Sequence, residues 1–61
     1  MVTSNIRHLR KSAGFTQAQL ADKLDIKRSL VGAYEEGRAE PKLSTLVNIA
    51  RLFDITLDDL I

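Results

Sequence analysis

Apolar residues recur along the whole chain with the spacing of helices. Ile6, Leu9 and Ala13 fall at positions i, i+3 and i+7, which places them on one face of a helix. Similar stripes continue through the rest of the chain, and no stretch alternates apolar and polar residues for long enough to predict a half-buried strand. The pattern therefore predicts an all-α fold of five short helices, at about 4–13, 17–24, 28–36, 43–53 and 57–61.

Turn and cap residues divide these apolar stripes. Gly14 and Gly37 follow the first and third predicted helices, where a residue in the left-handed conformation commonly ends a helix. Thr16 and Gln19 have the spacing of a capping box, in which each side chain satisfies a backbone amide of the other. Pro41 stands just before the fourth predicted helix and prevents the third from continuing into it.

The connection between the second and third predicted helices consists only of residues 25–27. So short a connection cannot lay two helices side by side, and it predicts the steep crossing of a helix-turn-helix motif over about 17–36. The turn needs one residue with positive φ. We expect Asp25 in that position, because an Asp side chain tolerates it at modest cost.

The face of the third predicted helix opposite its apolar stripe is slender and positively charged. Two cations, Lys27 and Arg28, stand there with three small residues, Ser29, Gly32 and Ala33. A groove can admit such an edge. Gly32 costs a helix about 0.5–1 kcal/mol relative to Ala, so it either allows close approach to such a groove or is merely tolerated.

Composition and charge limit the classes of function. The 61 residues include no Cys and one His, so we expect no bound metal, no cofactor and no enzymatic activity. The absence of Cys favours the cytoplasm, and no apolar run is long enough for a membrane span. Residues 1–28 carry a net charge of +4 and residues 29–61 a net charge of −3, which fits either a one-sided binding surface or an ordinary solvated one.

Three stretches, in this order and at this spacing, resemble the Cro/repressor (XRE-type) helix-turn-helix family: TQAQLA at 16–21, YEEGR at 34–38 and PKLSTL at 41–46. The resemblance extends from Ile6 to Leu60. It implies that residues 1–61 form a single domain, a compact five-helix bundle like the lambda repressor DNA-binding domain. It further implies a transcriptional regulator, expected to be a repressor, that binds double-stranded DNA sequence-specifically with the helix at about 28–36 in the major groove.

The resemblance assigns phosphate contacts to several positions. Gln17 matches a residue that donates a hydrogen bond to a phosphate oxygen, and Thr16 beside it is both a helix cap and a phosphate donor. Arg38 and Lys42 match positions in or next to the loop after the recognition helix, where cations meet the next phosphates. These contacts are expected to set affinity and register without reading sequence.

The resemblance also assigns the residues that enter the groove. Lys27, Arg28 and Ser29 match the start of the recognition helix, and Gly32 and Ala33 lie one turn further along its groove-facing side. We expect Arg28 to read guanine, and Ala33 to be limited to apolar contact with a thymine methyl group.

Two further positions match a structural pair of the family, and two depart from its pattern. Arg10 and Glu35 correspond to a pair that bridges the first and third helices, so we expect a partly buried ion pair there. Lys27 and Lys42 stand where relatives carry Ser or Thr caps, which predicts helix starts without a side-chain cap.

The partners implied by the resemblance are a palindromic operator and a second copy of the chain, at least on DNA. Leu57, Leu60 and Ile61 supply either an apolar dimer patch or part of the core. The chain ends inside the last predicted helix, which is compatible with a domain of a longer regulator. An antitoxin component and a protein-interaction module of the same fold remain as alternatives.

Overall fold

The computed structural model describes residues 2–61, with side chains from Asn5 onward, and the order of its elements agrees with the helical pattern. Within those residues the chain forms five helices and no strand. Each lies within two residues of the predicted bounds, so the predicted all-α fold is confirmed. The helices are α1 (Val2–Ser12), α2 (Gln17–Leu24), α3 (Arg28–Glu36), α4 (Leu43–Leu52) and α5 (Leu57–Leu60).

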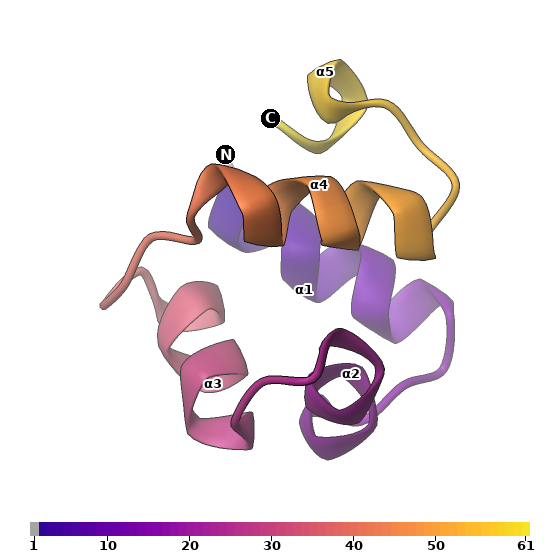
Figure 1. Cartoon of the computed structure of the whole chain (residues 1–61). Helices are drawn as coiled ribbons and strands as arrows, with labels where there is room; N and C mark the ends of the chain where they lie inside the picture. Colours follow the sequence, from indigo (N-terminus) through magenta and orange to yellow (C-terminus); the bar gives the residue numbers. More distant parts are fainter. Residues whose placement is uncertain (1) are drawn as a thin grey trace.

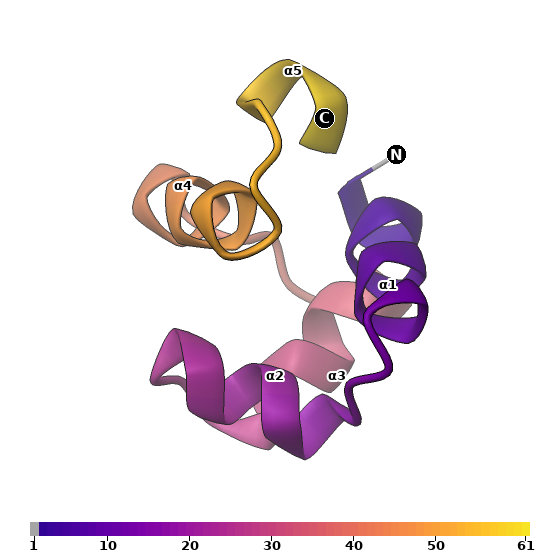
Figure 2. The ribbon, with the colours of Figure 1, turned by 90° about the vertical axis from the view of Figure 1, so that its right-hand side faces the viewer.

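The helices surround one core. Figures 1 and 2 show α1 and α4 on opposite sides of the molecule, with α2 and α3 at one end and α5 at the other. The radius of gyration of 10.0 Å agrees with the value of about 10.5 Å expected for a folded domain of this length. No helix in the described part of the chain is long and apolar enough to cross a membrane.

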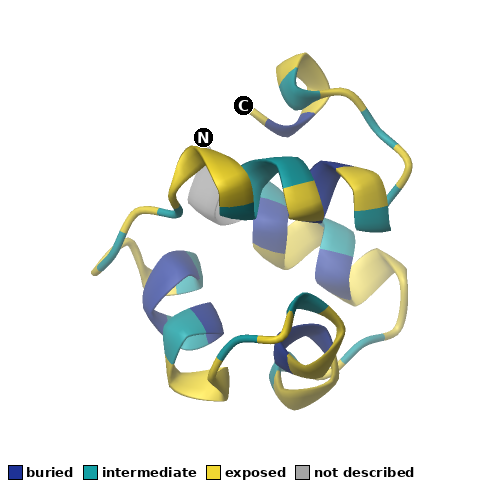
Figure 3. Ribbon diagram, viewed as in Figure 1, coloured by how far each residue is buried: buried dark blue, intermediate teal, exposed yellow. Residues whose placement is uncertain are grey.

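Each helix contributes one large, fully buried side chain to the core, and Figure 3 shows a buried segment in every helix. Burying each of these side chains stabilises the fold by about 1.5–3 kcal/mol, so every helix is held mainly by its apolar face. Leu60 therefore belongs to the core rather than to an apolar dimer patch, whereas Ile61 is exposed. The five side chains are Ile6, Leu20, Val31, Ile49 and Leu60.

The predicted cap chemistry is present at both ends of the helix-turn-helix. The side chains of Thr16 and Gln19 form the reciprocal capping box at the start of α2. Asp25 has φ 56° and ψ 46°, so the left-handed position in the turn is confirmed, and Gly37 ends α3 with φ 76°. Lys27 and Lys42 are N-cap residues without a side-chain cap hydrogen bond, as their side chains predict.

A second aspartate with positive φ was not anticipated. Asp54 ends α4 with φ 55°, and the amide of Ile55 donates to the carbonyl of Ala50 at 2.9 Å. The same arrangement follows α2, where the amide of Ile26 donates to the carbonyl of Ala21 at 3.0 Å. An apolar residue followed by Asp-Ile stands at the end of each helix, as Leu24-Asp25-Ile26 and Phe53-Asp54-Ile55, so this repeated signal was available in the sequence.

Candidate nucleic-acid interface

The turn of residues 25–27 sets α3 steeply across α2, as Figures 1 and 2 show. The left-handed conformation of Asp25 reverses the chain at once, and the amide of Asp25 donates to the carbonyl of Asp22 at 3.2 Å. Leu20 and Ala21 of α2 and Val31 of α3 are buried, so the two helices are packed against the core and hold a fixed crossing.

The N-terminus of α3 presents the cationic edge predicted from the sequence. Lys27, Arg28 and Ser29 are consecutive exposed residues at this end of the helix. Backbone hydrogen bonds fix their position, because the carbonyl of Lys27 accepts from the amides of Leu30 at 3.0 Å and Val31 at 3.4 Å. Two positive side chains and a hydroxyl therefore project from a rigid first turn. We call residues 27–29 the α3 edge.

Ala33 does not lie on an exposed face, contrary to the prediction. It is only 9% exposed. The amides of Arg38 and Ala39 donate to the carbonyl of Ala33 at 2.9 and 3.3 Å. Only a small part of Ala33 remains accessible, and we leave this residue out of the candidate interface.

Gly32 lies beside the N-terminus of α2. A Cβ atom at this position would be 3.7 Å from Oε1 and 4.0 Å from Nε2 of Gln17, which are ordinary van der Waals contacts. The missing side chain therefore leaves the Gln17 amide uncovered by α3. The residue itself is half-buried and in a helical conformation, so the fold does not require glycine there.

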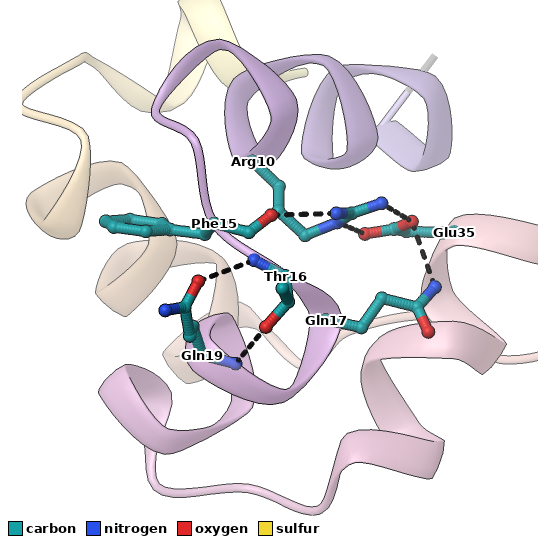
Figure 4. A network of polar contacts seen from close by, with 6 residues as sticks. All are labelled: Arg10, Phe15, Thr16, Gln17, Gln19 and Glu35. Carbon is teal, nitrogen blue, oxygen red and sulfur yellow. Dashed lines mark hydrogen bonds and ion pairs between the residues drawn. The ribbon is translucent and has the colours of Figure 1, made fainter.

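Thr16 and Gln17 begin α2 in different hydrogen-bonding situations (Figure 4). Oγ1 of Thr16 accepts from the amide of Gln19 at 3.1 Å, and Oε1 of Gln19 accepts from the amide of Thr16 at 2.8 Å. Nε2 of Gln17 donates to Oε1 of Glu35 at 3.2 Å, a contact that the sequence did not indicate. An amide nitrogen carries two hydrogens, so Gln17 keeps one donor for a second acceptor.

The predicted ion pair between Arg10 and Glu35 is confirmed and lies at the junction of α1, α2 and α3 (Figure 4). Nε of Arg10 donates to Oε2 of Glu35 at 2.6 Å, and Nη2 donates to Oε1 at 3.0 Å. Nη1 of Arg10 also donates to the carbonyl of Phe15 at 2.9 Å. The two side chains are only 11% and 4% exposed, so the pair is a buried strut between helices.

This geometry fixes the charge state of the pair. Burial alone would raise the pKa of Glu35. Hydrogen bonds from Arg10 and Gln17 and the charges of Arg10 and Arg7 lower it by more than burial raises it, so the pKa lies below its usual value. The hydrogen bond with Glu35 raises the pKa of Arg10. Both groups are ionised at neutral pH, and the Glu35 carboxylate holds the Gln17 amide in place.

The loop after α3 carries the two remaining predicted phosphate contacts. Lys42 is exposed at the start of α4. Arg38 is also exposed, but its guanidinium is already engaged, because Nε and Nη2 both donate to Oε2 of Glu36, the first at 2.8 Å. Arg38 and Glu36 stand on either side of Gly37, outside the spacing at which residues of one helix meet, so the sequence did not predict that they would pair.

Comparison with known proteins extends over nearly the whole chain. A family model described as "Helix-turn-helix" matches residues 6–60. The uncharacterized HTH-type transcriptional regulator YqaE of Bacillus subtilis is 43% identical over 61 residues, which are 100% of this chain and 53% of YqaE. The cryptic phage CTXphi transcriptional repressor RstR of Vibrio cholerae is 34% identical over 59 residues, which are 97% of this chain and 53% of RstR.

A solved structure shares the fold. The restriction-modification controller protein C.AhdI from Aeromonas hydrophila superposes with a TM-score of 0.89 and 30% sequence identity, covering 98% of this chain and 91% of C.AhdI. The chain thus spans about half the length of YqaE and RstR and nearly all of C.AhdI.

Proposed function

The chain belongs to the helix-turn-helix family, and from this membership we propose that it binds double-stranded DNA sequence-specifically as a transcriptional regulator, with α3 in the major groove. The observation that carries the proposal is the α3 edge, where Lys27, Arg28 and Ser29 are exposed together on a helix whose crossing angle is fixed by the core. A helix with such an edge fits the major groove, and the negative potential of the DNA attracts its cations.

Affinity comes from contacts to phosphates at both ends of the interface. Gln17 and Thr16 begin α2, where free backbone amides and the positive end of the helix dipole attract anions. Gln17 binds one phosphate with its second amide hydrogen while Glu35 holds the first. Lys42 binds a phosphate of the next backbone segment from the start of α4.

Sequence reading falls mainly on Arg28. A guanidinium can donate in parallel to O6 and N7 of guanine, a contact that discriminates by about 1–3 kcal/mol against another base pair. Ser29 beside it can donate to or accept from a base edge, and Gly32 allows the backbone of α3 to come close to the groove floor. The interface thus reads few base pairs per copy.

The test begins with selection of bound duplexes from a random pool, followed by titration of the selected duplex and a scrambled one at several salt concentrations. Arg28→Ala should weaken binding to the selected duplex by about 1–3 kcal/mol and leave the scrambled duplex less affected. Lys42→Ala should weaken both duplexes alike and reduce the slope of log K against log salt by about 1.

Arg51→Ala is the matched control, because Arg51 is an exposed arginine in the last turn of α4, outside the proposed interface. It removes the same charge as Arg28→Ala and should leave the preference between the two duplexes unchanged. Equal losses on both duplexes for Arg28→Ala would refute the assignment of sequence reading to this residue.

We further propose that two copies bind a palindromic operator in the cytoplasm and repress transcription. One helix-turn-helix reads too few base pairs for useful specificity, and two copies one helical turn apart double the site. Similarity to RstR, which is named a transcriptional repressor, supports the direction of regulation. An inverted repeat among the selected duplexes, bound by two copies, would be expected. A single asymmetric site bound by one copy would rule out the dimer.

A further inference from the structure

One cation of the candidate interface is paired with a carboxylate of its own chain. Nε of Arg38 donates to Oε2 of Glu36 at 2.8 Å, and Nη2 donates to the same oxygen. The side chains are 65% and 61% exposed, so the pair lies in solvent beside the C-terminal end of α3. A phosphate that approached Arg38 would therefore meet a carboxylate already bound to the guanidinium.

The position of Glu36 does not favour the fold. Glu36 is the last residue of α3, where the helix dipole is negative and disfavours a carboxylate. The last turn of α3 holds no basic residue that would compensate this charge, so the only compensation among the described residues comes from Arg38 in the loop. Stability of α3 thus gives no reason for an acid at this position.

We propose that Glu36 competes with DNA phosphate for Arg38 and so lowers the affinity of the domain for every duplex, whatever its sequence. This inference rests on the DNA-binding function proposed above. Binding either displaces Glu36 from Arg38 or leaves a carboxylate close to the phosphates, and both outcomes weaken association. An exposed ion pair changes an equilibrium constant by no more than about fivefold, so phosphate can displace the carboxylate.

Such a competitor changes affinity but not the preference among sequences. Arg38 contacts phosphate, which is present at every base pair, whereas discrimination depends on the α3 edge. Removal of the Glu36 charge should therefore tighten selected and scrambled duplexes by the same factor. The dependence on salt should become steeper, because one more cation is free to release a counterion from DNA.

The experiment compares Glu36→Gln with Glu40→Gln. Glu40 is also exposed, four residues later in the loop that ends at α4, and its substitution removes the same charge. With duplexes at about 50 mM salt, we expect Glu36→Gln to tighten binding about three- to fivefold and Glu40→Gln less than about twofold. Circular dichroism of both variants confirms that the fold is retained.

A double-mutant cycle with Arg38→Gln isolates the pair. In the Arg38→Gln background, Glu36→Gln should tighten binding no more than Glu40→Gln does, because the cation for which Glu36 competes is gone. Equal effects of the two glutamate substitutions in the parent chain, or a gain from Glu36→Gln that persists without Arg38, would overturn the inference and leave DNA binding intact. If the parent chain bound no duplex even at low salt, the proposed function would fail first, and the inference with it.

Discussion

Glu35 accepts hydrogen bonds from side chains of two other helices, so loss of its charge should destabilise the whole domain. In Glu35→Gln the buried guanidinium of Arg10 loses its counter-ion. It keeps the hydrogen bond to the Phe15 carbonyl, but one amide oxygen replaces the two carboxylate oxygens that accepted from it. The new amide also directs an N–H group toward Arg10, which is only a donor, or toward Gln17, whose own amide must then turn to present its oxygen. The substitution changes charge and not size, so packing of the neighbouring core should be little affected.

The expected loss follows from the burial of the pair. Removal of one partner from a buried ion pair costs about 3–5 kcal/mol, because the other charge remains desolvated. The side chains here are 11% and 4% exposed, so solvent cannot replace the lost partner. A domain of this length has a total stability of only about 3–9 kcal/mol. Glu35→Gln should therefore leave the protein at the edge of folding at 25 °C.

Urea unfolding followed by far-ultraviolet circular dichroism measures this loss. Glu36→Gln is the matched control, since it makes the same chemical change at the adjacent, exposed residue and should alter the free energy of unfolding by less than about 0.5 kcal/mol. Replacement of both charges in Arg10→Met with Glu35→Leu should recover more than half of the loss, because no buried charge remains. A loss below about 1 kcal/mol in Glu35→Gln would refute this account of the strut.

Three further predictions concern stability. Gly32→Ala should raise the free energy of unfolding by about 0.5–1 kcal/mol, because its Cβ would be 3.7 Å from Gln17 without a clash; a lower melting temperature than that of the parent chain would contradict this. Thr16→Ala should cost about 1 kcal/mol, since it removes the Oγ1 that accepts from the amide of Gln19, and chemical denaturation of the variant measures this loss. The pKa of Glu35 is lowered by folding, so its contribution is complete above the unfolded value of about 4.3 and is lost as the pH falls through the folded pKa. Unfolding measured between pH 7 and pH 2 should show this loss in the parent chain and a smaller one after Arg10→Met with Glu35→Leu.

Local signals in the sequence were sufficient to predict the helices and their caps. Helix propagation, capping boxes and left-handed ends depend on residues within about five positions of one another, and the sequence displays all of them. Asp25 and Gly37 were placed correctly on this basis. Asp54 was not predicted to have positive φ, although Asp-Ile follows the ends of both α2 and α4 and marks a left-handed residue in each case.

The candidate site was less predictable, because its details depend on segments that meet only in the folded chain. Helical periodicity puts Ala33 on the outward face of α3, but the residue is only 9% exposed in the folded chain. The contact of Gln17 with Glu35 joins residues 18 positions apart and requires the crossing of α2 over α3. Family resemblance supplied Arg10 and Glu35 as partners, which no local pattern would have paired.

Nδ2 of Asn5 donates to the carbonyl of Leu60 at 2.7 Å, so the first helix and the last helix lie side by side. The start of α1 and the end of α5 lie on one side of the molecule, and Figures 1 and 2 place α2 and α3 on the opposite side. A short peptide that joined the start of α1 to the end of α5 would close the backbone into a ring, and new ends could then be opened in a loop such as residues 37–41. A segment fused to either end of these residues would likewise extend from the side of the molecule remote from α3, which leaves α3 unobstructed.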